Sequence, residues 1–357
     1  MDQKQIRENQ MRVFEIMKNT AKEPQRALDK LVEFEAEALA KLTPETAEYY
    51  VSIITIFEAK GDCFTGLKKI HEAEQAYKSM VQNATKFYEM DKEKNDYPLG
   101  ASYLKLANFY RLLLGCHQLL QKPRELNESQ KKAFDIAEQC YKSCLGCTME
   151  NAKKGNLQHV DLHAVCLEAL MVFFGSVGDY QKASLFGKDA VRLNKNIYEK
   201  KDDKQQAVRL ANVMNGLAAI YMFSKNPQLA MENLEDAVYV LEAHEAENDM
   251  GIGTMLARYY ISLGSCYQAV EEEKDNAEDA YKQGLNRMVA LNDKSNNRMV
   301  DDVIQSYMFV AEYYAKQQKE LEAKAHYAWV MKLASDMFKA TKNPKYENLM
   351  KSLKSKV

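Results

Sequence analysis

Six cysteine and histidine side chains near the middle of the chain have the types and the spacing of a metal-binding set. They form two triplets, each spaced by four and then three residues: Cys140, Cys144 and Cys147, followed by His159, His163 and Cys166. On an α-helix each triplet lies along one face. In a helical hairpin that turns near Lys153, Cys147 would face His159 and Cys144 would face His163. Sulfur and imidazole ligands suit zinc, so one hypothesis is a metal-binding helical protein.

The alternative interpretation is that these residues belong to two ordinary packed helix faces. Free cysteine behaves as a small buried apolar residue, and helical spacing alone brings such residues together. The sequence contains no glycine-rich phosphate loop, no His-Glu-x-x-His motif and no nucleophile elbow. We therefore expect a protein that is not an enzyme and that holds no cofactor.

The elements that would position these residues are set by a repeat. Residues 73–80 read AEQAYKSM and residues 137–144 read AEQCYKSC, with six of eight letters identical. A small residue followed by partners four and seven places later recurs seven times, always on one helical face. These anchors are Ala27/Leu31/Phe34, Ala73/Tyr77/Met80, Ala137/Tyr141/Cys144, Ala183/Gly187/Ala190, Ala230/Leu234/Ala237, Ala277/Tyr281/Gly284 and Ala323/Tyr327/Val330. Their spacing of 46, 64, 46, 47, 47 and 46 residues indicates stacked repeats.

A second signature precedes most of the anchors. It has the form Leu-Gly/Ala-x-x-Tyr and occurs at 106–110, 217–221, 263–267 and, with Val for Leu, 310–314. Together the two signatures resemble the tetratricopeptide repeat, in which a first helix with Leu-Gly/Ala-x-x-Tyr is followed by a second helix with Ala-x-x-x-Tyr. The period is about a dozen residues longer than the ordinary 34. Repeats of this length with Asn-x-Leu-Ala-x-x-Tyr, here Asn215 to Tyr221, look most like those of kinesin light chains.

The resemblance covers nearly the whole chain and implies an all-α protein. We expect a right-handed α-solenoid of about seven antiparallel helix pairs with a C-terminal capping helix, forming a single domain over 1–357. The expected repeats are 1–41, 44–91, 97–153, 158–199, 203–245, 248–292 and 297–340, with the cap at 343–357. In the first two repeats the Leu-Gly/Ala-x-x-Tyr signature is blurred, and Gly61-Asp62 is expected to end the first helix of the second repeat.

The 64-residue interval contains extra chain. A helix is expected from about 101 to 120, followed by an insertion at 121–129 before the next helix. Insertions in repeat proteins map to loops on one face. This one is either a tolerated surface loop or part of a binding site.

The composition limits the classes of partner that the protein is expected to bind. The 49 basic and 51 acidic residues are interspersed and give a net charge of −2, so no strong field recruits nucleic acid or an anionic membrane. The N-terminal stretch has no apolar run typical of a signal peptide, and no segment approaches the ~20 apolar residues of a membrane helix. Seven cysteines spread over helices favour a reducing compartment. We expect a cytoplasmic protein with no nucleic-acid or membrane partner.

What remains for function is the surface of the first helices, which line the concave side in stacked helix pairs. Positions two and five residues on either side of the signature Leu should point into that groove. The candidate peptide-binding residues there are Asn108, Arg111, Glu168, Asn212, Asn215, Arg258, Gln305 and Glu312, and Ile261 shares the pattern. An asparagine amide both donates and accepts hydrogen bonds. In the kinesin light chain family, Asn at matching positions binds the backbone of extended peptides.

The resulting hypothesis is a non-enzymatic scaffold or adaptor that binds a protein or an extended peptide. One alternative is a peptide-sensing bacterial regulator resembling the Rap family, which pairs a three-helix N-terminal piece with a tetratricopeptide stack. Another is the metal-binding protein considered above. A third possibility is that Asn212 and Asn215 are merely solvated on an exposed face.

Overall fold

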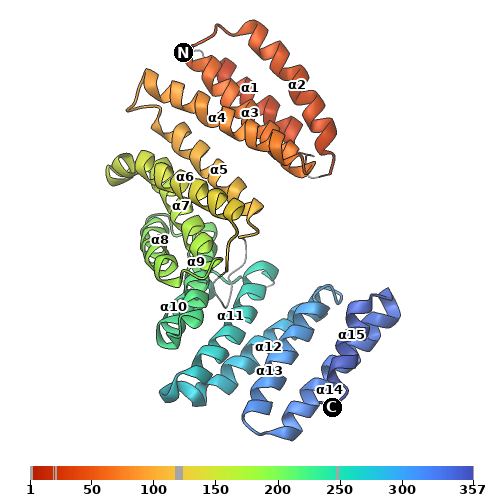
Figure 1. The fold of residues 1–357 in the computed structure, drawn as a ribbon. Helices are drawn as coiled ribbons and strands as arrows, with labels where there is room; N and C mark the ends of the chain where they lie inside the picture. Colours follow the sequence, from red (N-terminus) through yellow and green to blue (C-terminus); the bar gives the residue numbers. More distant parts are fainter. Residues whose placement is uncertain (1–2, 19, 21, 117–123, 247–248, 357) are drawn as a thin grey trace. The chain divides into compact units, whose positions relative to one another are not determined.

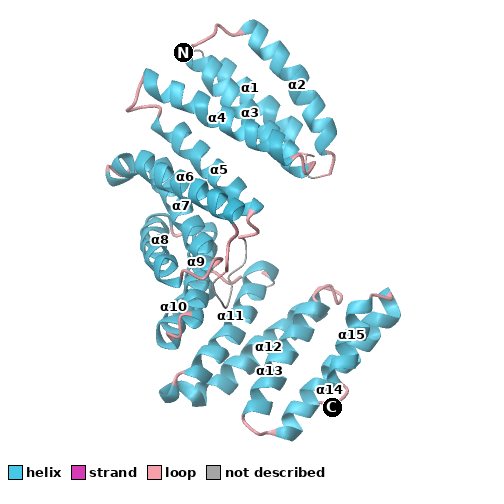
Figure 2. Cartoon of the chain, in the orientation of Figure 1, coloured by secondary structure: helices cyan, strands magenta, loops and turns pink. Residues whose placement is uncertain are grey.

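The computed structural model describes residues 3–18, 20, 22–116, 124–246 and 249–356. Within these residues the chain forms fifteen α-helices and one short 3-10 helix, and no strand (Figure 2). The chain divides into two compact units, Met1–Phe186 and Gly187–Val357. The all-α class predicted from the repeat is confirmed. That the whole chain is one domain stays a prediction.

Unit 1 is a series of helical hairpins whose successive members pack side by side (Figure 1). Its helices are α1 (Gln3–Met17), α2 (Pro24–Lys41), α3 (Ala47–Gly66), α4 (Ile70–Met90), α5 (Asp96–Leu113), α6 (Glu128–Lys153), α7 (Leu157–Gly175) and the beginning of α8 (Tyr180–Lys201), which contains the boundary between the units. Helix α5 starts and ends earlier than expected, and residues 117–120 of the predicted helix lie outside the described residues.

Unit 2 continues the same pattern. Its helices after α8 are α9 (Lys204–Phe223), α10 (Pro227–Glu242), α11 (Met250–Ala269), the 3-10 helix η1 (Glu271–Asn276), α12 (Ala277–Lys294), α13 (Val300–Lys316), α14 (Glu320–Thr341) and α15 (Pro344–Leu353). Helix α15 packs against α14, as predicted for a cap. The seven expected helix pairs are therefore present, with α1, α3, α5, α7, α9, α11 and α13 as the first helices.

Polar caps explain where several helices begin. The first turn of a helix leaves backbone N–H groups without partners, and a side-chain oxygen before the helix can accept from them. Asn127 accepts from the backbone of Gln130, whose side chain returns the bond, so α6 starts with a capping box. Similar side-chain caps start four of the first helices and the final helix: Thr46, Asn156, Asp203, Asp249 and Asn343.

The anchor positions form the core of both units. All 21 anchor residues of the seven repeats are buried. Gly264 of α11 lies directly under Tyr281 of α12, so that a Cβ added at Gly264 would be 2.7 Å from the ring. Gly284, the third anchor of that repeat, packs on the backbone of α11, and a Cβ there would lie 2.7 Å from the carbonyl oxygen of Ala257. Close approach of the two helices therefore requires small residues at these positions.

The second repeat uses the same contact, although its signature is hidden in the sequence. Helix α3 does not end at Gly61 as expected but continues to Gly66. The ring of Tyr77 lies directly against Gly61, and a Cβ added at Gly61 would be 2.5 Å from that ring. The signature therefore reads Lys60-Gly61-x-x-Phe64, with Lys in place of Leu. Lys60 is tolerated there because its ammonium group forms an ion pair with Glu35 of α2.

Tyrosines link three of the repeats to the one before. The last residue of the first-helix signature donates a hydrogen bond to a glutamate on the preceding second helix: Tyr110 to Glu74 at 2.7 Å, Tyr267 to Glu235 at 2.8 Å and Tyr314 to Glu278 at 3.1 Å. These bonds were not predicted. They use a hydroxyl that the packing of the ring brings to the surface between two repeats.

The end of the insertion is tied to unit 1. The backbone N–H of Arg124 donates to the carbonyl oxygen of Val177 at 3.0 Å, and its guanidinium donates to that of Leu114. These contacts join the end of the insertion to the turns that follow α5 and α7. Part of the insertion, up to residue 123, lies outside the described residues.

Helix α7 is more apolar than expected, since no segment was expected to approach the composition of a membrane helix. It has 19 residues with a mean hydropathy of 1.4, which is enough by length and composition to cross a membrane. Within the protein, however, 56% of the 18-residue stretch with this hydropathy is buried. A mostly buried core helix has the same composition, so this one helix is weak evidence for a membrane span.

Replacing Gly264 by Ala should destabilise unit 2 by about 1–3 kcal/mol, because the new methyl group overlaps the buried ring of Tyr281. Gly146, in the interior of α6, is the matched control, since a Cβ there meets nothing within 4 Å. Gly146→Ala should stabilise the protein by roughly 0.5–1 kcal/mol, since alanine is the better helix former. Chemical denaturation of both variants measures the difference. Equal effects would contradict the packing described here.

Stability should also fall in acid through Glu278. Hydrogen bonds from Lys282 and Lys319, and then from Tyr314, lower the pKa of Glu278 to about 2. Because the folded-state pKa lies below that of the unfolded chain, this contribution is complete above about pH 4.5 and is lost as the pH falls towards 2. The group is partly exposed, so the contribution is at most about 1 kcal/mol. Glu278→Gln should lower the melting temperature at pH 7 and have little effect near pH 2. A difference of the same size at both pH values would contradict this assignment.

Candidate functional site

The predicted peptide-binding residues all lie on first helices, and each unit holds its own share. In unit 1, Asn108 and Arg111 of α5 and Glu168 of α7 are half-buried. Unit 2 holds the remaining five, of which Asn215 is half-buried and the others are exposed: Asn212, Asn215, Arg258, Gln305 and Glu312. The position five residues before the signature Leu therefore predicts accessible side chains. Ile261, two residues before Leu263, is instead buried and packs beneath Gly284. Placing Ile261 in the groove was wrong.

Unit 1 has a pocket on the face of its first helices. It measures about 430 Å³ and is formed by residues from α1, α3, α5 and α7. Its lining is Gln10, Val51, Ile54, Thr55, Glu58, Tyr97, Pro98, Ala101, Ser102, Leu104, Lys105, Asn108 and Leu162. Of the predicted site residues only Asn108 lines it. Arg111 and Glu168 lie outside the lining.

A tyrosine of the second helix holds Asn108 in place. The hydroxyl of Tyr141, an anchor residue of α6, donates to Oδ1 of Asn108 at 2.9 Å. Burial raises the pKa of Tyr141, and the nearby guanidinium of Arg111 partly opposes that shift. Tyr141 therefore stays a neutral donor. The amide nitrogen of Asn108 has no hydrogen-bond acceptor among the described residues, so it remains able to donate to a ligand.

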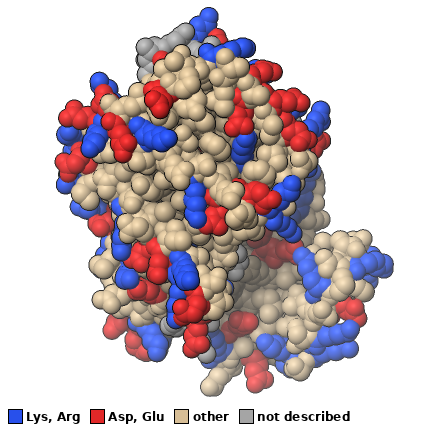
Figure 3. All heavy atoms as spheres, turned by 45° about the horizontal axis from the view of Figure 1, so that its top comes forward, with Lys and Arg blue, Asp and Glu red and all other residues tan. Residues whose placement is uncertain are grey.

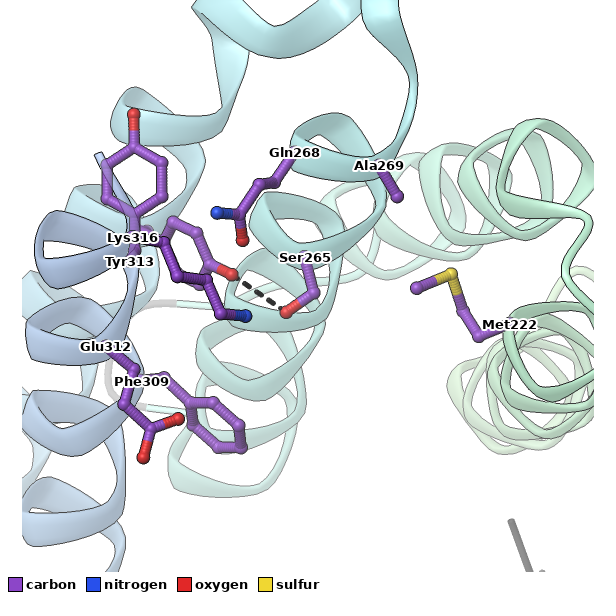
Figure 4. A pocket seen from close by; sticks show the side chains of 9 residues that line it. Met222, Ser265, Gln268, Ala269, Phe309, Glu312, Tyr313 and Lys316 are labelled. Carbon is purple, nitrogen blue, oxygen red and sulfur yellow. Dashed lines mark hydrogen bonds between the residues drawn. The ribbon is translucent and has the colours of Figure 1, made fainter. Parts of the chain in front are cut away.

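Unit 2 has a second pocket, of about 370 Å³, again on the face of the first helices. Figure 4 shows side chains from α9, α11, α12 and α13 around one space. The lining is Met222, Ser265, Gln268, Ala269, Tyr281, Phe309, Glu312, Tyr313 and Lys316. Ser265 and the hydroxyl of Tyr281 are hydrogen-bonded at 2.9 Å. Both an acidic and a basic side chain therefore border this pocket, together with amide and hydroxyl groups.

Sequence reasoning named Glu312 but missed most of its neighbours. Ser265 and Gln268 lie two and five residues after the signature Leu263, so the rule that selected Arg258 could have selected them as well. Phe309 and Lys316 flank Glu312 at spacings of three and four residues on α13, which is the signal for one helical face.

Two predicted residues of unit 2 already have partners in the next repeat. The hydroxyl of Tyr259 donates to Oδ1 of Asn212 at 3.0 Å. The guanidinium of Arg258 donates to Asp302 of α13 at 2.6 Å. Asn212 is therefore not simply solvated. Its amide is oriented by Tyr259, just as Tyr141 orients Asn108 in unit 1.

Comparison with known proteins adds information on the fold. No protein-family model matches the sequence, and no curated protein is similar to it. Among solved structures, the apo form of RapI aligns with a TM-score of 0.62 at 14% identity, over 98% of this chain and 80% of RapI. BtubC (BKLC) from P. vanneervenii aligns with a TM-score of 0.52 at 16% identity, over 75% of this chain and 92% of BtubC. Kinesin light chain "nearly identical TPR-like repeats" from Podosopora anserina align with a TM-score of 0.46 at 14% identity, over 69% and 100% of the two chains.

The chain has the TPR-like repeat fold. The helix pairs, their signatures and the likeness to RapI and BtubC agree on it. At these identities the likeness concerns the fold alone.

In this TPR-like protein the cysteine and histidine triplets pack against other protein groups where α6 and α7 meet. Cys144 lies opposite Cys166, not His163, and the sulfur of Cys166 donates to the carbonyl oxygen of Tyr141 at 3.4 Å. Hydrogen bonding to Cys144 and burial raise the pKa of Cys166. Cys140, Cys144 and Cys166 are buried, and Cys147 is half-buried. The predicted pairing across the hairpin was wrong, because α6 and α7 meet in a different register.

The two histidines bind other polar groups. Nε2 of His159 lies 2.9 Å from Oδ1 of the buried Asp96, which also accepts from Asn151. Nδ1 of His163 lies 2.7 Å from the hydroxyl of Thr148. Among the described residues, no three His, Cys, Asp or Glu side chains are placed to hold a metal ion. The geometry therefore gives no support to metal binding through Cys140, Cys144, Cys147, His159 and His163.

We expect a chelator to leave the melting temperature unchanged, because His159 and His163 already have hydrogen-bond partners. If a structural metal were bound, its removal would lower the melting temperature, since metal binding adds to folding stability. Thermal melts with and without chelator, with metal analysis of the purified protein, measure this. A melting temperature that drops on chelation and is restored by zinc would contradict the core interpretation.

Proposed function

We propose that this TPR-like protein is a non-enzymatic scaffold that binds an extended peptide, or an extended segment of a partner protein, on the face of its first helices. One observation carries the proposal. In each unit the described pocket is lined mainly by first helices of successive repeats: α1, α3, α5 and α7 in unit 1, and α9, α11 and α13 in unit 2, where Tyr281 of α12 also contributes. A surface formed by several helices offers room for an elongated ligand.

The side chains on these faces suit a peptide backbone. An extended peptide presents alternating N–H and C=O groups, and an asparagine amide can pair with both. We propose Asn108, Arg111, Glu168, Asn212, Asn215, Arg258, Gln305 and Glu312 as contact residues, with the arginines and glutamates reading side chains or termini. The amides that are already oriented by Tyr141 and Tyr259 support this role.

The surface charge bears on which other partners are expected. Figure 3 shows acidic and basic side chains interspersed on the face in view, with no broad region of one sign. A nucleic-acid or anionic membrane surface would be attracted by a field of one sign. We therefore propose a cytoplasmic protein whose partner is a peptide or a protein.

A second candidate function is a peptide-sensing regulator similar to Rap proteins. It is favoured by the alignment with apo RapI over 98% of this chain, which is a likeness of fold. The two candidates share the ligand class and differ in the response. A regulator changes conformation when the peptide binds, whereas a passive scaffold does not. Small-angle scattering of the full chain with and without a selected peptide distinguishes them.

The test of the proposed site uses peptides selected against the full chain from a displayed random library. Replacing both Asn212 and Asn215 by Ala should weaken the selected peptides by roughly 10- to 100-fold, because two hydrogen bonds of ~0.5–1.5 kcal/mol each are lost. Calorimetric titration measures the affinity.

The control is Asn286→Ala, since Asn286 is exposed on the second helix α12. Asn286→Ala should leave binding unchanged. The Asn212 change also leaves the buried Tyr259 hydroxyl without its acceptor, so the melting temperature should fall slightly in the double variant and not in Asn215→Ala alone. Selected peptides that bind the double variant as tightly as the original chain would contradict the site.

A further inference from the structure

The pocket of unit 1 is not uniform along the helices that line it. Towards the beginning of α3 and α5 its lining is apolar, with Val51 and Ile54 on α3 and Tyr97 on α5. Towards the ends of the same helices it becomes charged, with Glu58 on α3 and Lys105 on α5. A ligand that fills the pocket therefore meets an apolar end and a charged end.

The charged end carries more negative than positive charge. A single ammonium group, that of Lys105, lies 3.2 Å from Glu58 and 3.0 Å from Asp62. Burial lowers the pKa of Lys105, but the carboxylates of Asp62 and Glu58 outweigh it and hold the pKa above its usual value. Lys105 is therefore charged, and it is shared between two carboxylates. Glu58 remains 45% exposed, so it is accessible to a second cation.

A third carboxylate acts on the apolar end. Burial raises the pKa of Tyr97, and the negative charges of Asp161 and Glu58 contribute to that shift. With one ammonium group between two carboxylates, the charged end of the pocket favours a basic ligand group over an acidic one.

The spacing of the two ends matches that of an extended peptide. Ile54 and Glu58 are four residues apart on one helix, and so are Ala101 and Lys105, which gives about 6 Å at 1.5 Å per residue. In an extended chain, side chains two residues apart lie on the same side and are separated by roughly 6.6 Å. Residues i and i+2 of a bound strand can therefore reach the two ends together.

We propose that the unit 1 pocket recognises an aliphatic or aromatic side chain with a lysine or arginine two residues away in an extended peptide. The apolar side chain enters between Val51, Ile54 and Tyr97, and the cation meets Glu58. This specificity rests on the proposed peptide-binding function. It adds the class of side chain that the first-helix face of unit 1 selects.

Selection from the displayed random library gives the first test. Peptides enriched on the full chain should contain an apolar residue and a basic residue at a spacing of two. If peptides are enriched without that pair, this inference is overturned while the proposed function stands. If no peptide is enriched at all, both are overturned.

Two charge variants with opposite expected effects give the second test, made on the enriched peptides. Glu58→Gln should weaken them about two- to fivefold, because one partner of a half-exposed ion pair is lost. Lys105→Gln should strengthen them by a similar factor, since it leaves both carboxylates to the ligand. Both effects should shrink at high salt.

The control is Glu33→Gln, which makes the same chemical change on the exposed side of α2, away from the pocket. It should leave binding unchanged. A merely structural role of the ion pair would make both Glu58→Gln and Lys105→Gln weaken binding, with matching losses of melting temperature. That outcome, or equal effects of Glu33→Gln and Glu58→Gln, would overturn the inference.

Discussion

The structure depends on a close contact between a tyrosine ring and a helix backbone. In two repeats the ring of the second-helix anchor lies directly over a glycine of the first helix, Tyr77 over Gly61 and Tyr281 over Gly264. Such contact is possible only where the first helix carries almost no side chain, and it fixes both the distance and the relative rotation of the pair. Alanine fills the equivalent place in other repeats, where Ala107 and Ala311 are fully buried.

This contact also determines which surface is left for binding. Once one side of a first helix is committed to its second helix, and the signature tyrosine to the preceding repeat, the remaining side is exposed or half-buried. The pockets of both units lie on that side. The surface on which peptide binding is proposed is therefore the one that the packing of the repeats leaves exposed.

The periodic part of this arrangement could be read from the sequence, and the contacts across repeats could not. The anchors recur at a nearly fixed interval, so helix pairs and core residues followed directly. Gly61 escaped recognition because Lys60 replaces the expected leucine, and only the partner Glu35 on another helix explains that choice. The partners of Asn212 and Arg258, Tyr259 and Asp302, depend on the register between repeats. The register of α6 against α7 likewise decided that Cys144 meets Cys166.

These internal partners change what the exposed polar residues can do. A free asparagine or arginine loses rotamer freedom when it binds, at about 0.5–1.5 kcal/mol for each immobilised side chain. Asn108, Asn212 and Arg258 are already held by Tyr141, Tyr259 and Asp302, so much of that entropy is lost during folding instead of binding. Each amide that accepts from a tyrosine through Oδ1 keeps its N–H₂ available as a donor. The arrangement favours ligands whose carbonyl oxygens meet those donors in a fixed register, which an extended backbone provides and a helical one, with its carbonyls bonded internally, does not.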